Sequence, residues 1–501
     1  MSPARFVYLL LAVLAVVPTT LRAQSLEDFE GKVTEATLSN GIDVILVEKH
    51  DAPVTAFVNW VDVGAVNELT GKTGISHLFE HMAFKGTHLV GTKDAEAEKA
   101  AMANVDVVYA KIVKARRAGD ADALAALEAE FKTAQDEAAS FVVPNEFGQI
   151  IEREGGQGLN AFTNADATVY FFSLPSNKAE LWAYLESERY RSGVLREFYK
   201  ERNVVMEERR LRTESQPIGR LVEQFVATAF TAHPYAQPVV GHMSDLKTIS
   251  REDAQAYFEK HYVPQNMTIA IVGDIEPEET IATLESYFGR IPRGEEPAPI
   301  ETVEPVVKAE RMVKLTDPGQ PWYLVGYPIP AVTHPDYQAL QVLSTVLSNG
   351  RSSRLYKRLV TDEKIAFSTG AFPGFPGDKY PSQMIFYATT AAGHENNEVA
   401  SAIDIEVARL KTELVSEAEL NRAKTKLRAS LIRQLDSNSG LALRLANVHT
   451  KTGDWRNLFH NIDAIQELTA EDLQRVANQY FDNQRRTVGM IATESKEEAT
   501  S

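Results

Sequence analysis

The feature that most constrains this chain is a short segment in which two histidines and a glutamate stand among apolar residues. It reads Gly74-Ile-Ser-His-Leu-Phe-Glu-His-Met-Ala-Phe84. Its apolar residues recur at helical spacing, which predicts a buried amphipathic helix. On a helix, His77 and His81 project from one face, and Glu80 emerges beside them. Two neutral imidazoles next to a carboxylate are typical of a Zn²⁺ site that leaves Glu80 free to act as a base.

The same string has a plainer interpretation, a chance grouping of polar residues in an ordinary helix. The chain has 11 histidines among 501 residues, so about two in a hundred such chains would contain the string by chance. Burying three polar side chains without partners would also cost several kcal/mol. A bound metal supplies those partners, and the string is the reverse of the His-Glu-x-x-His zinc motif. The zinc interpretation is therefore favoured.

A catalytic zinc usually has three protein ligands, so a third ligand has to be found. The candidate segment is 201–212, where Glu201 and Glu208 stand seven residues apart and share one helical face. Taken alone, a stretch so rich in Glu and Arg favours a solvated surface helix. Beside His77 and His81, it becomes the place to look for the third ligand.

Several further segments carry a resemblance to a known family. They are, in chain order, residues 38–41, 64–68, 74–87, 155–156, 160–163, 201–208 and 352–355. The chain resembles the pitrilysin/insulinase family of zinc peptidases, and most closely its small bacterial members, which are similar to the mitochondrial processing peptidase. The resemblance implies that one Zn²⁺ is bound by His77, His81 and Glu208. It also implies that Glu80 is the general base and that Glu201 is a carboxylate supporting the site.

The resemblance also indicates where a substrate would bind. Family members hold an extended peptide along the edge of a strand, because backbone pairing grips a chain without requiring particular side chains. The matching residues here are Asn160, Ala161, Phe162 and Thr163. An ordinary turn and strand is the alternative for each of them taken singly.

Residues 93–143 differ from their surroundings in being dense in Ala, Glu, Lys and Asp. They predict two helices, 94–117 and 121–140, joined by a short turn at Gly119. Compact family members reach the segment at residue 155 much sooner, so the resemblance implies an insertion. It is either a solvated spacer, or a lid or surface for a partner subunit.

Strand patterns appear on both sides of this insertion. Residues 33–38 and 42–47 flank Asn40-Gly41, which predicts a β-hairpin. Residues 55–63 predict a strand rich in β-branched and aromatic residues, and 268–272 predict another.

The N-terminus, residues 1–23, predicts a secretory signal peptide with a charged start at Arg5 and an apolar run over 6–17. The run is too short for a comfortable membrane span, although an uncleaved anchor is the alternative. No other stretch is apolar enough to cross a bilayer. The chain has no Cys, which leaves His and carboxylates as metal ligands and fits the bacterial periplasm.

The remaining length suits two domains. We expect a zinc-binding domain over 24–289, a Pro- and Glu-rich linker over 290–308, and a second domain over 309–495. The second domain repeats the order of elements without the metal motif, which indicates a decayed duplication. The predicted fold class is α+β: two homologous halves, each an antiparallel-rich sheet flanked by helices, facing each other across a cleft.

The formal net charge of −17 argues against nucleic acid or an anionic membrane surface as a partner.

The sequence departs from the family pattern at one place. Many active members carry an Arg and, seven residues later, a Tyr that help to hold the substrate, where this chain has Val360 and Phe367. Neither side chain can donate a hydrogen bond. The pair is therefore dispensable here, or a homologous subunit of a heterodimer or homodimer supplies it.

These observations predict an exported zinc metalloendopeptidase that cleaves extended or unfolded peptides, with Glu80 as the general base. The alternative is a non-catalytic subunit of a larger assembly. The intact metal motif favours the enzyme.

Overall fold

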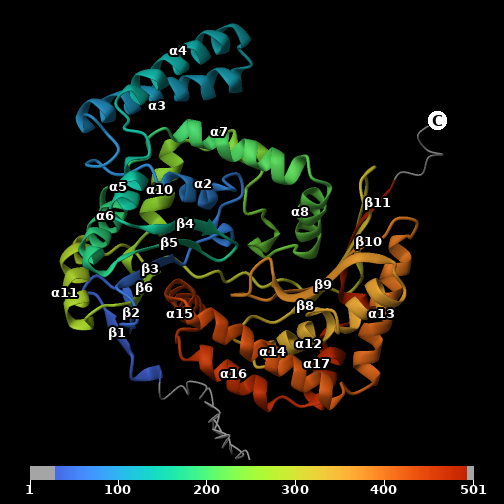
Figure 1. Ribbon diagram of the computed structural model, residues 1–501. Coiled ribbons are helices and arrows are strands. Elements are labelled where there is room, and N and C mark those ends of the chain that lie inside the picture. The colour runs from blue at the N-terminus through green and yellow to red at the C-terminus, as the bar shows by residue number, and fades with distance from the viewer. Residues whose placement is uncertain (1–28, 494–501) are drawn as a thin grey trace, which may run out of the picture.

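The structure is a computed structural model that describes residues 29–493. The predicted signal peptide, residues 1–23, lies outside the described residues. The chain folds into two halves, each with one sheet and a set of helices (Figure 1). Among the helices of residues 29–493, none is long and apolar enough to cross a membrane.

The first half is built on a six-stranded sheet with the strand order β1-β2-β6-β3-β5-β4. Its strands are β1 (Val33–Thr37), β2 (Asp43–Glu48), β3 (Val54–Val61), β4 (Gln157–Thr163), β5 (Thr168–Pro175) and β6 (Met267–Gly273). The hairpin predicted at Asn40-Gly41 is confirmed: β1 and β2 are antiparallel, with Val33 opposite Val47. Gly41 has a φ of 100°, which explains the glycine in this turn.

The second half is built on a five-stranded sheet with the strand order β7-β11-β8-β10-β9. Its strands are β7 (Arg311–Thr316), β8 (Trp322–Ile329), β9 (Ala366–Phe375), β10 (Ser382–Thr390) and β11 (Thr487–Ala492). If β1 is left out, the first sheet has the same topology: β2, β6, β3, β5 and β4 correspond to β7, β11, β8, β10 and β9. Each sheet also contains one parallel pair, β2 with β6 and β7 with β11. The predicted α+β fold with two similar halves is confirmed.

The helices of the first half are α2 (Ile75–Met82), α3 (Ala95–Ala118), α4 (Ala121–Ser140), α5 (Glu146–Arg153), α6 (Ala179–Ser192), α7 (Phe198–Arg209), α8 (Pro217–Ala229), α9 (Met243–Leu246), α10 (Arg251–His261) and α11 (Pro277–Tyr287). Those of the second half are α12 (Tyr337–Ser348), α13 (Asn396–Thr412), α14 (Glu417–Asp436), α15 (Asn438–Thr452), α16 (Asn457–Glu467) and α17 (Ala470–Tyr480). Residues 291–310, between the halves, contain neither helix nor strand.

Each half packs one of its helices on the sheet of the other half. Helix α15 of the second half packs on β3 and β6 of the first sheet, where Leu441 and Leu445 join a core cluster with Trp60. Helix α8 of the first half packs on β7 and β11 of the second sheet, where Phe225 joins a cluster with Ile491. Because each sheet depends on a helix from the other half for one of its faces, the two halves share their cores.

The predicted helical hairpin is confirmed as α3 and α4, which pack on each other and stand at one end of the molecule above α7 (Figure 1). Gly119 ends α3 with a φ of 69°, and the Asp120 side chain caps α4 by accepting from the Ala123 amide. A buried ion pair ties the hairpin to the rest of the half. Arg196 Nε lies 2.7 Å from Glu98 Oε1, and both side chains are almost fully buried.

Candidate metal centre

Helix α2 presents the two histidines of the motif, and its first turn is held in place by its surroundings. The Glu68 carboxylate accepts the backbone amides of Gly74 and Ser76 at 2.7 and 2.8 Å, which caps the helix. Gly74 has a φ of 89°, and a Cβ there would lie 2.7 Å from the Val240 carbonyl oxygen. Only glycine fits at this approach. Burial raises the pKa of Glu68 to about 8.

Helix α7 presents Glu201 and Glu208 toward α2, with which it packs. An adjacent side of α7 is anchored by two buried guanidinium groups. Arg202 donates to the Ile249 carbonyl at 2.8 Å, and Arg209 donates to the Gly241 carbonyl at 2.6 Å. These contacts fix the rotation of α7 and therefore the direction of its two inner carboxylates.

The three residues that the family resemblance assigns to zinc lie together. Glu208 Oε2 is 3.6 Å from His77 Nε2 and 3.4 Å from His81 Nε2. One ligand atom from each of the three lies within 4.8 Å of the other two. Two ligand atoms of a tetrahedral zinc with bonds of about 2.1 Å stand about 3.4 Å apart. The donor types and these two spacings therefore fit Zn²⁺.

The surroundings shift the pKa values of the two imidazoles in opposite directions. Burial, partly offset by Glu208, lowers the pKa of His77 to about 4, so this imidazole is neutral at pH 7, as a metal ligand must be. Burial also opposes protonation of His81, but Glu201 beside the ring and the charges of the nearby carboxylates raise the pKa of His81. Three carboxylates close to one imidazole make this a strongly cation-attracting site.

Glu201 lies behind His81, away from the three-residue group. Its Oε2 is 3.7 Å from His81 Nδ1, and its Oε1 is 2.6 Å from Lys85 Nζ. Burial would raise the pKa of Glu201, but its interactions with His81 and Lys85 outweigh burial and lower this pKa to about 2. Glu201 is therefore ionised and oriented as a partner for the second nitrogen of His81.

Two cationic side chains near the site were missed by the sequence reasoning. Lys85 bridges Glu201 and Glu197, and Arg212 forms an ion pair with Glu208 Oε1. Because Arg212 contacts one oxygen of Glu208, the other oxygen is left to face the histidines. Arg212 stands four positions after Glu208 in the helical continuation of α7, so helical spacing was a signal that could have found it, whereas Lys85 lies beyond the end of α2.

Glu80 lies outside the three-residue group. Burial raises the pKa of Glu80, and Thr163 on β4 partly offsets this effect. The carboxylate is therefore close to the strand that the resemblance assigns to the substrate.

Within residues 29–493, strand β4 is the last strand of its sheet and pairs only with β5. Its residues Asn160 to Thr163 therefore have one backbone edge without a neighbouring strand. The side chains alternate: Ala161 belongs to the core cluster that contains α2, whereas Phe162 packs against Trp60 on the opposite face. Along this segment, an approaching peptide would meet mainly backbone.

The positions without the family's Arg and Tyr both lie in the second half. Val360 is half-buried against the second core. Phe367 lies on β9, the outermost strand of its sheet, and is 60% exposed.

Comparison with known proteins agrees with this fold. Residues 43–105 match the family described as insulinase (peptidase family M16), and residues 248–427 match the peptidase M16 inactive domain. The chain is 30% identical to zinc protease PqqE of Helicobacter pylori, over 97% of this chain and 98% of that protein. It is 27% identical to a probable mitochondrial-processing peptidase subunit beta of Arabidopsis thaliana, over 90% of this chain and 76% of that protein.

Among solved structures, a protease from Helicobacter pylori matches with a TM-score of 0.78 and 27% identity, over 92% of this chain and 99% of that chain. These likenesses define a two-half peptidase fold. The chain belongs to peptidase family M16, the insulinase family, which confirms the resemblance to pitrilysin/insulinase proteins.

Proposed function

We propose that this member of a peptidase family is an exported zinc metalloendopeptidase. The observation that carries the proposal is the convergence of His77, His81 and Glu208 from two helices, with 3.4 and 3.6 Å between ligand atoms. The relative with 30% identity, which is named a zinc protease, supports the choice of metal.

The proposed chemistry divides between the metal ligands and Glu80. His77, His81 and Glu208 would hold one Zn²⁺, which when bound polarises a peptide carbonyl and lowers the pKa of a bound water. Glu80 accepts the proton of the attacking water and delivers it to the leaving amine. Its raised pKa makes Glu80 a stronger base than an ordinary glutamate, which favours uptake of the water proton.

Glu201 acts through His81. Hydrogen bonding to Nδ1 of a ligating imidazole fixes the ring orientation and increases the basicity of the other nitrogen. Lys85 forms ion pairs with both Glu201 and Glu197. It is therefore a positioning residue one step further from the chemistry.

The proposed substrate is an extended or unfolded peptide lying along β4, at residues Asn160 to Thr163. The free edge of β4 supports this placement because it offers backbone donors and acceptors close to Glu80. A folded protein would not present such a strand without local unfolding, so we propose that the cleft between the two halves selects flexible chains.

A non-catalytic assembly subunit is the competing function, and one observation bears on it. The match described as an inactive domain covers 248–427, whereas the segment with His77, Glu80 and His81 lies within the match to 43–105. The inactive-domain match therefore falls outside the metal motif and does not count against catalysis by the first half.

The test is metal analysis together with peptide hydrolysis by the same purified protein. We expect about one zinc per chain and cleavage of an unfolded polypeptide such as reduced, alkylated casein. A chelator should stop the cleavage, and added Zn²⁺ should restore it. A protein that cleaves as well after zinc removal would refute the metallopeptidase, and one without zinc or cleavage would favour the assembly subunit.

The proposed function includes a cellular location and a partner subunit for this chain. The N-terminal signal pattern and the absence of Cys support a periplasmic enzyme. Val360 and Phe367 support a homologous partner subunit that contributes the missing Arg and Tyr.

A further inference from the structure

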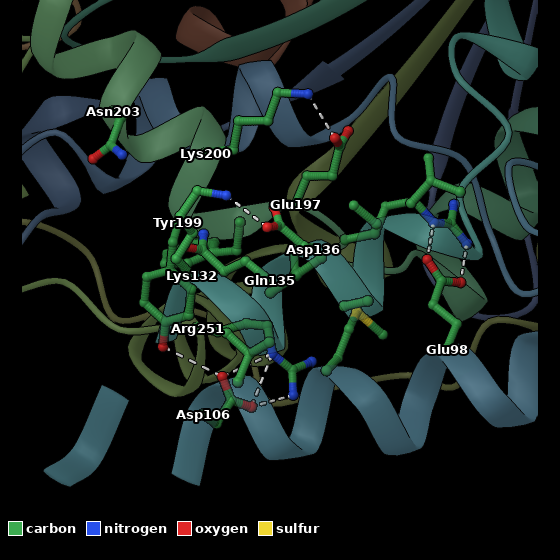
Figure 2. Close-up of a pocket in the computed structure, with 18 of the residues that line it drawn as sticks. Glu98, Asp106, Lys132, Gln135, Asp136, Glu197, Tyr199, Lys200, Asn203 and Arg251 are labelled. Atoms are coloured by element: carbon green, nitrogen blue, oxygen red, sulfur yellow. Dashed lines mark hydrogen bonds and ion pairs between the residues drawn. The ribbon is translucent and has the colours of Figure 1, made fainter. Parts of the chain in front are cut away.

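A second cavity lies on the outer side of α7, between this helix and the α3–α4 hairpin (Figure 2). Its volume is about 660 Å³, within the range of cavities that bind small molecules or peptide side chains. Its apolar lining comes from both walls and includes Met102, Val105, Val142, Leu195 and Phe198. Val204 of α7 also faces the cavity and is 43% exposed. Together with this apolar lining, Val204 makes the cavity suited to a ligand with apolar groups.

The charged groups around the cavity are already in ion pairs, four of them between lining residues, whereas Glu207 pairs with Arg210 outside the lining. The pairs are Glu98 with Arg196, Asp106 with Arg251, Lys132 with Asp136, and Glu197 with Lys200. A charged ligand would have to compete with these internal partners, so the pairing disfavours it.

Two amide side chains are the exception. Gln135 of α4 and Asn203 of α7 carry no dashed contact to the other residues drawn in Figure 2. They come from opposite walls, and each offers both a hydrogen-bond donor and an acceptor. This is the pattern that a peptide group satisfies, since its N–H and C=O need one acceptor and one donor.

The cavity adjoins the candidate metal centre. A separate cavity of about 500 Å³ is lined by Glu80 and His81. Four residues, Val142, Arg196, Glu197 and Lys200, line both cavities. The two cavities are therefore neighbours that share part of their lining, so one extended peptide is long enough to contact both.

We infer that the larger cavity binds an apolar segment of an extended peptide whose scissile bond lies at Glu80. The α3–α4 hairpin would then be one wall of a second peptide-binding site, beyond its place as a spacer. The inference rests on the proposed function for the identity of the substrate. Binding of an apolar peptide at this cavity does not itself require hydrolysis.

The test measures binding in full-length protein carrying Glu80→Gln, so that no probe is consumed. The probe is a dansyl-labelled peptide of leucine, phenylalanine and alanine with blocked ends, compared with a glycine-serine peptide of equal length. The variant is Val204→Lys, which places a charge in the apolar lining. The matched control is Val107→Lys on α3, since Val107 is 56% exposed and does not line the cavity.

We expect Val204→Lys to weaken binding of the apolar peptide about tenfold or more. Val107→Lys should leave the affinity within about twofold. The glycine-serine peptide should bind weakly to all forms. Equal affinities in the two lysine variants would overturn the inference.

A second pair of variants separates a peptide from any other apolar ligand. Gln135→Leu and Asn203→Leu remove the amides but keep the lining apolar. They should weaken binding of the peptide and leave binding of the dye anilinonaphthalene sulfonate unchanged. If peptide affinity is also unchanged, the cavity takes apolar small molecules and the peptide assignment is wrong.

The two proposals fail separately. If the wild-type chain hydrolyses no polypeptide, yet Val204→Lys selectively loses the peptide, the proposed function and the scissile bond at Glu80 are wrong, whereas peptide binding at the cavity stands. If hydrolysis is efficient and the two lysine variants bind equally, only the cavity assignment is wrong.

Discussion

The ammonium group of Lys85 lies 2.6 Å from the Glu201 carboxylate, and Glu201 in turn lies beside His81 Nδ1. A cation, a carboxylate and an imidazole thus form one chain leading to the candidate metal site. Replacing Lys85 by Met leaves Glu201 and Glu197 facing each other without their shared cation. We expect zinc affinity to fall by about 10-fold to 100-fold, measured by competition with a chelator of known affinity.

The control for this change is Lys178→Met. Lys178 makes a comparable ion pair with Glu154 at 2.8 Å, but away from the site. It should leave zinc affinity unchanged, and Lys85→Arg should recover part of the loss. Unaltered affinity in Lys85→Met would remove Lys85 from the site's support.

Glu80→Gln should keep zinc and lose hydrolysis. The amide has nearly the same size as the carboxylate, but it cannot accept a proton from water at neutral pH. Loss of a general base lowers the rate by about 10²- to 10⁴-fold. Steady-state cleavage of a quenched fluorescent peptide, with zinc content measured on the same sample, tests this. Turnover near that of the wild type would exclude Glu80 from the mechanism.

Three neighbouring glutamates of α7 provide an internal comparison. Glu208→Gln removes a proposed ligand and should empty the site, whereas Glu201→Gln should weaken zinc affinity about 10-fold to 100-fold. Glu207 faces outward, pairs with Arg210 and is exposed, so Glu207→Gln should retain full zinc. Elemental analysis of the three variants decides the assignment. Full zinc in Glu208→Gln together with none in Glu207→Gln would shift the ligand by one residue.

The candidate site was predictable to the extent that it depends on local spacing. His77, Glu80 and His81 fall within one helix, and Glu201 and Glu208 within another, so helical geometry alone orders each group. That the two helices meet depends on packing between residues more than a hundred positions apart. For this step, the family resemblance supplied what periodicity lacks.

The packing of one helix from each half on the sheet of the other half was not predictable in the same way. An amphipathic pattern in α15 shows that Leu441 and Leu445 need a partner surface, but it does not identify the sheet that supplies it. The buried pair of Arg196 and Glu98 is similar, since neither residue carries a local signal of its burial. Strand β6 is buried along its whole length because helices cover both faces, which agrees with its continuous apolar sequence.

The depressed pKa of His77 predicts a pH dependence for the metal-free protein. The unfolded chain binds a proton at this residue below about pH 6.5, whereas the folded chain, with a pKa of about 4, does not. Where the unfolded state binds more protons, stability falls as pH falls. The His77 contribution should therefore be complete above about pH 6.5 and lost progressively toward a pH of about 4.

His77→Gln should flatten this part of the curve, measured by urea unfolding in the presence of a chelator. Buried His261, whose pKa burial also lowers to about 4, lies outside the three-residue group. His261→Gln should therefore also weaken the dependence of unfolding free energy on pH, without changing zinc affinity. If the wild type and His77→Gln have the same pH dependence, His77 titrates normally in the folded protein.

The last prediction concerns the two positions that lack hydrogen-bonding side chains, Val360 and Phe367. A substrate backbone stretched past Glu80 needs donors on its side facing away from the metal, and the family's Arg and Tyr would provide them. We expect a homologous partner that carries this pair and lacks the metal motif, so that each chain alone is weakly active. Co-purification from the native host, followed by assays of each chain and of the mixture, tests this.

The competing expectation is that backbone pairing along β4 suffices, so that a monomer or homodimer is fully active. Phe367→Tyr distinguishes the two in the isolated chain. Phe367 is 60% exposed, so the added hydroxyl meets no packing constraint and leaves stability nearly unchanged. Isolated wild-type chain that cleaves peptides as fast as any mixture, with no gain from Phe367→Tyr, would rule out the partner. Stimulation by a second chain that carries the Arg and Tyr would establish it, because only that chain supplies the donors that Val360 and Phe367 lack.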